Sequence, residues 1–86
     1  MKAVIKEGQI TGGYSPAEAV FAGIAASEVS GRIIVGRSEK GRSTEMGVIS
    51  GLLSGGSSVI SLGRCLETEL FFASRLAKCG LCIYIK

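Results

Sequence analysis

The fold of this 86-residue chain is constrained most by short apolar runs, which alternate with segments whose apolar residues recur at helical spacing. The clearest run is Ile33-Ile34-Val35, which Gly36 bounds and which suits a strand buried on both faces. Similar runs lie at residues 59–62 and 81–85, and residues 3–6 are compatible with a short strand. Strands that alternate with helices are typical of an α/β domain with a largely parallel sheet. We therefore expect the order β-α-β-α-β-α-β.

Three helices are expected between these runs. Ser15 and Glu18 have the spacing of a capping box, which marks the start of the first helix. Ser43 or Thr44 caps the second, and the third begins near Thr68. The apolar residues at helical spacing, expected to form the stripes of these helices, are Val20, Phe21, Ile24 and Ala25, then Met46, Ile49, Leu52 and Leu53, and finally Leu70, Phe71, Ala73, Leu76 and Ala77.

The length and composition predict one folded domain over residues 1–86. Apolar residues make up 47% of the chain and charged residues 20%, which argues against disorder. The N-terminal apolar stretch is too short for a signal peptide, and no run approaches the roughly 18 apolar residues of a membrane span. We therefore expect a cytoplasmic protein without a membrane partner. The net charge of +3 is mild, and the absence of an aromatic platform argues against nucleic-acid binding.

The three cysteines are predicted to be free thiols. Cys79 and Cys82 form a C-x-x-C, but zinc needs two further ligands, and the chain offers only Cys65 and no histidine. A redox C-x-x-C opens a helix after a strand, whereas this one joins the end of a helix to a strand. We therefore predict packing roles for these residues and no metal site.

The loop at residues 36–43 is a candidate anion-binding site. In α/β folds, anions bind where a strand end meets a helix start, because backbone N–H groups and the helix dipole converge there. The loop lacks the spacing of a P-loop, and the favoured alternative is a solvated loop in which Arg37 makes a structural hydrogen bond. The candidate anion-binding residues are Arg37, Ser38, Lys40, Arg42 and Ser43.

Several segments, in order, resemble the first domain of the α-D-phosphohexomutases, the family of phosphoglucomutases and phosphomannomutases. Residues 15–20 (SPAEAV) resemble the T-P-E-x-A helix start of this family, and residues 33–37 (IIVGR) resemble its V-V-V-G-R-D strand. Residues 51–56 (GLLSGG) resemble its G-L-L-S-A-G helix end. Residues 61–73 and 80–85 resemble its D-L-G…T-P-A-L-Y-F-A and G-V-M-I-T blocks, so the likeness extends over nearly the whole chain.

The resemblance implies a three-layer α/β/α sandwich with a four-stranded mixed sheet in the order 2-1-3-4. The first strand would be antiparallel to the others, and the second and third helices would share one face. The resemblance also implies no mutase activity for this chain alone. In the family, the phosphoserine loop T-A-S-H-N-P and the Mg²⁺-binding loop D-G-D-x-D-R lie beyond the segment that matches. No catalytic residue, metal or cofactor is expected.

Three hypotheses about function stay open at this point. The chain is a stand-alone phosphohexomutase-like domain that acts by self-association through its edge or terminal strand, or by binding a partner or a phosphorylated ligand. Alternatively, it is a truncated or split piece of a mutase, an intramolecular phosphotransferase of carbohydrate metabolism, active only with a complementary chain. The third hypothesis is an unrelated α/β binding module that shares only the layer pattern, since fold does not imply function.

Overall fold

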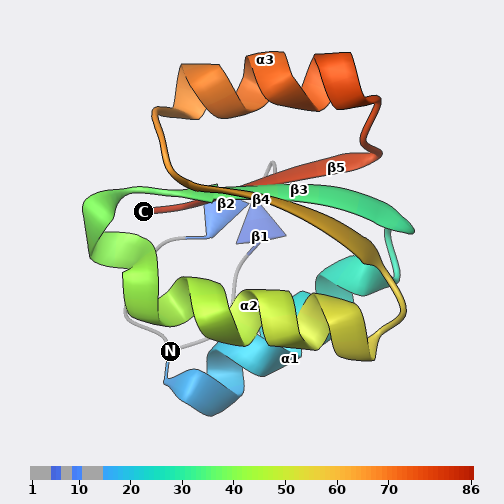
Figure 1. Ribbon diagram of the computed structural model, residues 1–86. Helices are drawn as coiled ribbons and strands as arrows, with labels where there is room; N and C mark the ends of the chain where they lie inside the picture. The colour runs from blue at the N-terminus through green and yellow to red at the C-terminus, as the bar shows by residue number, and fades with distance from the viewer. Residues whose placement is uncertain (1–4, 7–8, 11–14) are drawn as a thin grey trace.

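The computed structural model describes residues 5–6, 9–10 and 15–86, with side chains described from residue 15 onward. Its elements alternate between strands and helices (Figure 1). In chain order they are β1 (Ile5–Lys6), β2 (Gln9–Ile10), α1 (Pro16–Ser27), β3 (Arg32–Arg37), the short 3-10 helix η1 (Glu39–Gly41), α2 (Arg42–Ser54), β4 (Ser58–Arg64), α3 (Glu67–Ala77) and β5 (Leu81–Ile85).

One mixed sheet organises the described part of the chain, with strands in the order β1-β2-β5-β3-β4. The three long strands β3, β4 and β5 are parallel, and Ile34 of β3 lies opposite Ile60 of β4 and Cys82 of β5. β2 runs parallel to β5, and β1 runs antiparallel to β2. Helices cover both faces of the sheet (Figure 1). The prediction of an α/β domain with parallel strands alternating with helices is therefore confirmed.

The predicted strand order 2-1-3-4 is wrong. It placed the strand at residues 3–6 between those at 33–35 and 59–62, whereas β3 pairs directly with both β4 and β5. The apolar content of β3 explains its central position, because Ile33, Ile34 and Val35 are at most 1% exposed and a strand apolar on both sides belongs in the interior. β1 and β2 have two residues each and lie at the margin.

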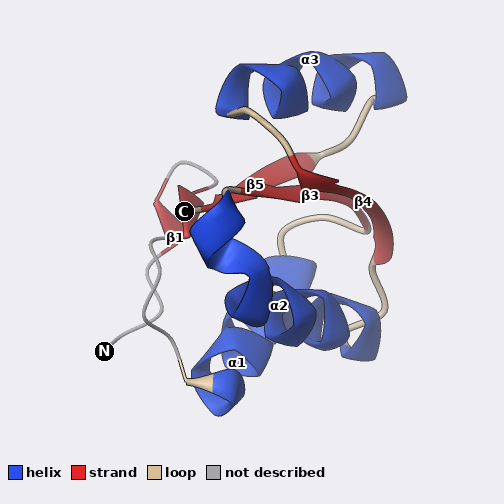
Figure 2. Ribbon diagram, turned by 60° about the vertical axis from the view of Figure 1, so that its left-hand side comes forward, coloured by secondary structure: helices blue, strands red, loops and turns tan. Residues whose placement is uncertain are grey.

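The predicted pairing of the second and third helices on one face is also wrong. The chain passes from β3 to the edge strand β4 and then returns across β3 to β5. Right-handed crossovers in opposite directions place their helices on opposite faces of a sheet. α1 and α2 therefore lie together under one face, and of the described helices only α3 covers the other (Figure 2).

The first two helices meet through their smallest residues. Ala19, Ala22 and Ala26 of α1 are buried against α2 and the sheet. A Cβ atom on Gly51 would lie 2.9 Å from the Cα atom of Gly23, so the two helix backbones approach each other closely. This contact rotates the larger side chains of α1 away from the core.

The expected apolar stripes are therefore only partly correct. Leu52 and Leu70 are fully buried, as expected, and Val20, Ile49, Ala73 and Ala77 are partly buried. Where small residues make the helix contact, the large residues between them point to solvent. The residues expected in the stripes but exposed in the structure are Phe21, Ile24, Ala25, Met46, Leu53, Phe71 and Leu76.

The capping box at the start of α1 is present as predicted. The backbone N–H of Glu18 donates to Ser15 Oγ at 3.2 Å, and the N–H of Ser15 donates to Glu18 Oε1 at 3.0 Å. The cysteines Cys65, Cys79 and Cys82 are free thiols, also as predicted. Among the residues that the structure describes, no helix combines the length and the apolar character needed to cross a bilayer.

Candidate functional site

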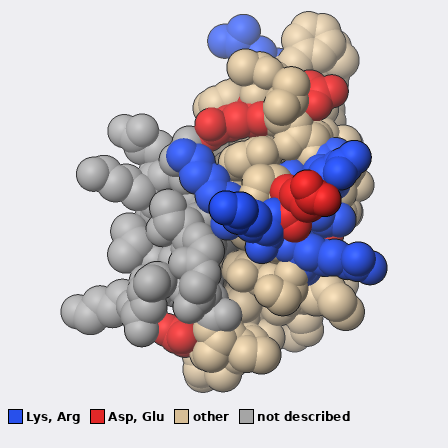
Figure 3. All heavy atoms as spheres, turned by 90° about the vertical axis from the view of Figure 1, so that its left-hand side faces the viewer, with Lys and Arg blue, Asp and Glu red and all other residues tan. Residues whose placement is uncertain are grey.

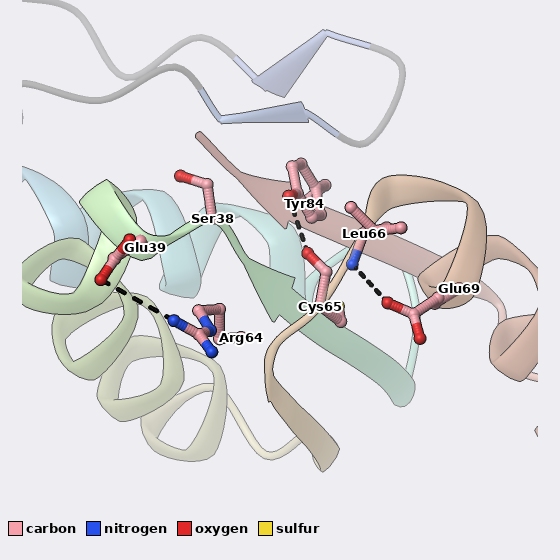
Figure 4. A pocket seen from close by; sticks show the side chains of 7 residues that line it. All are labelled: Ser38, Glu39, Arg64, Cys65, Leu66, Glu69 and Tyr84. Atoms are coloured by element: carbon pink, nitrogen blue, oxygen red, sulfur yellow. Dashed lines mark hydrogen bonds and ion pairs between the residues drawn. The ribbon is translucent and has the colours of Figure 1, made fainter.

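A pocket of about 410 Å³ lies at the carboxyl end of the parallel strands. The loop that leaves β3 leads to α2 on one face, and the loop that leaves β4 leads to α3 on the other. In open α/β sheets, ligands bind in the crevice at such a switch point, because the two loops diverge and leave a hollow. Figure 4 shows the residues that line the pocket, which are Ser38, Glu39, Arg64, Cys65, Leu66, Glu69 and Tyr84.

A bulge at the end of β4 positions the pocket residues of that strand. The register shifts so that Gly36 lies opposite Gly63, which leaves Leu62 as an extra residue in β4. Gly63 has a φ of 68°, a left-handed conformation that favours glycine, and bulges of this kind redirect the side chains that follow. A Cβ on Gly36 would lie 2.6 Å from Cys65 Sγ, so glycine on β3 makes room for that thiol. Arg64 and Cys65 therefore enter the pocket directly after the bulge.

Hydrogen bonds between the strand ends form a connected floor for the pocket. The Tyr84 hydroxyl of β5 donates to the carbonyl of Cys65 at 2.8 Å, and the N–H of Cys65 donates to the carbonyl of Arg37 at 3.0 Å. The N–H of Ser38 donates to the carbonyl of Ile85 at 2.8 Å. The ends of β3, β4 and β5 are thus linked through backbone groups, which favours a preformed site.

Arg64 supplies the positive charge of the pocket. Its Nη1 lies 3.7 Å from Glu39 Oε1, and the two side chains are 67% and 84% exposed (Figure 4). Exposed ion pairs of this length contribute little energy, because water and salt screen them. The guanidinium group therefore stays accessible to an anion that enters the pocket.

Burial keeps the thiol of the pocket protonated. It raises the pKa of Cys65, and the carboxylates of Glu69 and Glu45 act in the same direction. Loss of solvent also raises the pKa of Tyr84. The pocket consequently contains a neutral thiol and neutral hydroxyl groups at physiological pH. The carboxylate of Glu69 accepts the Leu66 N–H at 2.8 Å and so belongs to the start of α3.

The structure separates the five residues predicted to bind an anion. Ser38 lines the pocket. Arg37 does not, because its Nε donates to Glu45 Oε1 at 3.2 Å and the two side chains are only 17% and 14% exposed. Lys40, Arg42 and Ser43 are exposed on η1 and α2 outside the pocket lining. The favoured alternative, a structural role for Arg37 within a solvated loop, agrees with this placement.

Basic groups nevertheless gather at the carboxyl end of the sheet, as Figure 3 shows for this side of the molecule, with carboxylates among them. Lys40 and Arg42 follow β3, Arg64 ends β4, and Lys86 follows β5. Arg64, Cys65 and Tyr84 were not among the residues predicted from the sequence to bind a ligand. A usable signal was present, since Gly-Arg closes two of the expected parallel strands, at residues 36–37 and 63–64.

Within the described residues, no group of three or more His, Cys, Asp or Glu side chains is arranged to hold a metal ion. Comparisons of the chain with protein-family models, with curated proteins and with solved structures find no match.

Proposed function

We propose that this chain is a small α/β binding domain that takes a phosphorylated small molecule in the pocket at the carboxyl end of its sheet. The observation that carries the proposal is the exposed guanidinium of Arg64, placed by a glycine bulge at the switch point of a parallel sheet. Arginine is well suited to phosphate, because its planar group donates two parallel hydrogen bonds to phosphate oxygens.

The size and chemistry of the pocket support a small polar ligand. Its volume of about 410 Å³ lies within the range of about 300–1,000 Å³ that is typical of ligand sites. Ser38 and Tyr84 add hydroxyl groups, and Leu66 adds an apolar wall. This mixture suits a sugar-like or nucleoside-like body attached to the phosphate.

The contact between Glu39 and Arg64 suggests how an anion enters. A carboxylate of Glu39 occupies the position beside the guanidinium at 3.7 Å, and a phosphate carrying more charge replaces it. Removing the carboxylate should then strengthen binding, because the ligand no longer competes with it.

The residues of the pocket support binding of a ligand without its chemical conversion. The chain contains no histidine to act as a general base. The raised pKa of Cys65 leaves its thiol protonated, and a thiol is a weak nucleophile compared with a thiolate.

The resemblance to phosphohexomutases guides the choice of ligands to test. It suggests hexose phosphates first, although the strand order that it implied differs from the order found. Whether the chain is a piece of a mutase that needs a complementary chain stays a prediction, and the proposal of a phosphate pocket does not depend on it.

Titration of the purified chain with glucose 6-phosphate, glucose 1-phosphate and mannose 6-phosphate, followed by backbone NMR shifts, tests the proposal. We expect saturable shifts at the ends of β3, β4 and β5, with glucose itself giving none. Arg64→Ala should weaken binding at least about tenfold, the loss expected for one charge-assisted contact. Glu39→Gln should tighten it.

Arg42→Ala is the matched control, because Arg42 is also exposed near this edge but does not line the pocket. It should change affinity by less than about threefold, as expected for a distant screened charge. Equal binding by Arg64→Ala and the unmodified chain, or shifts with glucose as large as those with the phosphates, would contradict the proposal. Conversion of a hexose phosphate by the pure chain would contradict the claim of binding without turnover.

A further inference from the structure

The outer face of α3 is largely apolar, and none of the other described elements covers it. This α3 outer face consists of Thr68, Phe71, Phe72, Arg75 and Leu76, in which Phe71, Phe72 and Leu76 are 56%, 67% and 71% exposed. A shallow hollow of about 300 Å³ lies between its first four residues. Contiguous exposed apolar side chains with charged neighbours mark interaction surfaces in soluble proteins.

The charge pattern of α3 distinguishes it from the other helices. α3 has Glu67 and Glu69 in its first turn and Arg75 in its last, with Lys78 directly after it. Neither α1 nor α2 has a basic residue in its last turn. α1 instead has Glu18 in its first turn and Glu28 at its C-cap, so two copies of α1 laid antiparallel would bring like charges together.

We propose that the α3 outer face pairs with the same face of a second copy of this chain, with the two helices antiparallel. A twofold dimer of this kind places the acidic end of each α3 beside the basic end of the other. A parallel pair would instead place like charges together, which disfavours that arrangement. Phe72 lies at the centre of Glu67–Ala77 and therefore close to the twofold axis, where it contacts its own copy.

The layer arrangement agrees with this pairing. Two helices cover one face of the sheet, whereas α3 is the single helix over the other face in the part of the chain that the structure describes (Figure 2). A second α3 gives the apolar residues on this side of the molecule a second helix to pack against.

The expected dimer is weak. A specific interface takes about 10% of the surface of a small protein, which is about 500 Å² of the 5173 Å² of this chain. The total of about 1,000 Å² from both copies lies at the low end of specific interfaces. Because small interfaces of this kind associate weakly, we expect monomer at about 10 µM and substantial dimer at about 1 mM.

Light scattering and sedimentation equilibrium over this concentration range test the proposal. The measured average mass should approach twice the mass of one chain at the highest concentration. Phe72→Glu should weaken the association at least about tenfold, because it puts two carboxylates at the centre of the interface. Arg75→Glu should also weaken it, and raising the salt concentration should weaken the dimer of the unmodified chain.

Phe21→Glu is the control, because Phe21 is similarly exposed but lies on α1, on the other side of the sheet. It should leave the dimer unchanged within about twofold, as expected away from an interface. Circular dichroism verifies that each variant is folded, and Leu76→Lys replaces Phe72→Glu if that variant does not fold. A mass that stays monomeric up to about 1 mM overturns the proposal. So does a dimer that Phe21→Glu disrupts and the α3 variants leave intact.

Discussion

Arg37 and Arg64 lie opposite each other at the ends of β3 and β4, yet their guanidinium groups have different environments. Arg37 is paired with Glu45 of α2 at 3.2 Å and is partly buried, whereas Arg64 is exposed beside Glu39 at 3.7 Å. The difference follows from the sheet, since β3 is central and lies over α2, and β4 is the edge strand. The same dipeptide Gly-Arg therefore makes a structural contact in one strand and presents an exposed guanidinium group in the next, the group that we propose binds phosphate.

Replacement of these two arginines should have opposite consequences. Arg37→Ala leaves the partly buried Glu45 carboxylate without the guanidinium group, and its buried Oε2 already has no hydrogen-bond partner within the described residues. We expect a loss of about 2 kcal/mol in the free energy of unfolding, because removing one member of a partly buried pair leaves the other charge without a partner. Arg64→Ala should change it by less than about 0.5 kcal/mol, as is usual for exposed positions. Urea unfolding of both variants measures the difference.

The double variant Arg37→Met with Glu45→Met is the internal control for the first variant. It removes both charges and should therefore be more stable than Arg37→Ala. If Arg37→Ala unfolds at the same urea concentration as the unmodified chain, the pair contributes nothing and this account of β3 is wrong.

The close contact between α1 and α2 should make two glycines irreplaceable. In an isolated helix, alanine is more favourable than glycine by about 1 kcal/mol. Here a Cβ on Gly51 would meet the backbone of α1, and a Cβ on Gly23 would lie 2.8 Å from the Leu52 nitrogen. We expect Gly23→Ala and Gly51→Ala each to lower stability by about 1–3 kcal/mol, the usual cost of overpacking.

Gly31→Ala provides the contrast for these glycines. Among the described residues, apart from its two chain neighbours, no atom lies within 4 Å of a Cβ built on Gly31, and its φ lies outside the left-handed range. The substitution should be neutral or slightly stabilising, because it reduces the freedom of the unfolded chain. Thermal melts of the three variants compare them directly, and an equal loss for all three would show that the helix contact is not the cause.

The fold class was predictable from sequence because the strand signals are local. The β-branched run at 33–35 and the capping box at Ser15 and Glu18 each depend on residues close together in the chain. The strand order was not predictable in this way. It depends on which strands pair with β3, and the order taken from the family resemblance put the strand at residues 3–6 beside β3. The same order put the strand at residues 81–85 beside that at 59–62 instead of beside β3, so both crossovers were expected to run in one direction and α3 was placed on the wrong face.

The candidate site was predictable only at the end of β3. Ser38 was identified because it lies in a basic loop between a strand end and a helix start, which is visible in the sequence. Arg64 and Tyr84 reach the same pocket only through the pairing of β3 with β4 and β5, which is a long-range contact. The buried face of α1 was predicted wrongly for a related reason. The contact between Gly23 and Gly51, which is also long-range, determines which side of α1 is buried.

The capping box should make stability depend on acid pH. Hydrogen bonds from the backbone and side chain of Ser15 lower the pKa of Glu18 below its ordinary value of 4.5. A carboxyl group with a lowered folded pKa stabilises the fold above its unfolded pKa, and the contribution is lost as the pH falls through the folded value. Glu18→Gln should therefore lower the melting temperature at pH 7 and have little effect below about pH 3.

A double-mutant cycle with Ser15→Ala measures the coupling between the two residues of the capping box. The two residues interact directly, so the effect of Glu18→Gln should be smaller in the Ser15→Ala background than in the unmodified chain. Additive effects at pH 7 would indicate that the box contributes no coupling to stability.

The thiols of Cys65 and Cys82 should react slowly at neutral pH. Burial is the first cause that raises the pKa of each above the ordinary value of 9.0, and neighbouring acidic groups add to it. The thiolate is the species that reacts with iodoacetamide, so both residues should be modified several-fold more slowly at pH 8 than a thiol in an unstructured peptide. Because the folded state favours the protonated thiols, stability should also fall as the pH rises above about 9.0 towards their folded pKa values.

Mass spectrometry of peptides after timed labelling follows each cysteine separately, and the same labelling in urea is the control, since unfolding should remove the protection.

The same labelling also tests whether the thiol lies at the proposed site. Cys65 lines the pocket whereas Cys82 does not, so a bound hexose phosphate should slow the labelling of Cys65 and leave that of Cys82 unchanged. Rapid labelling of Cys65 at pH 7 in the folded chain would show that its thiol is ionised and able to act as a nucleophile, which would contradict binding without turnover.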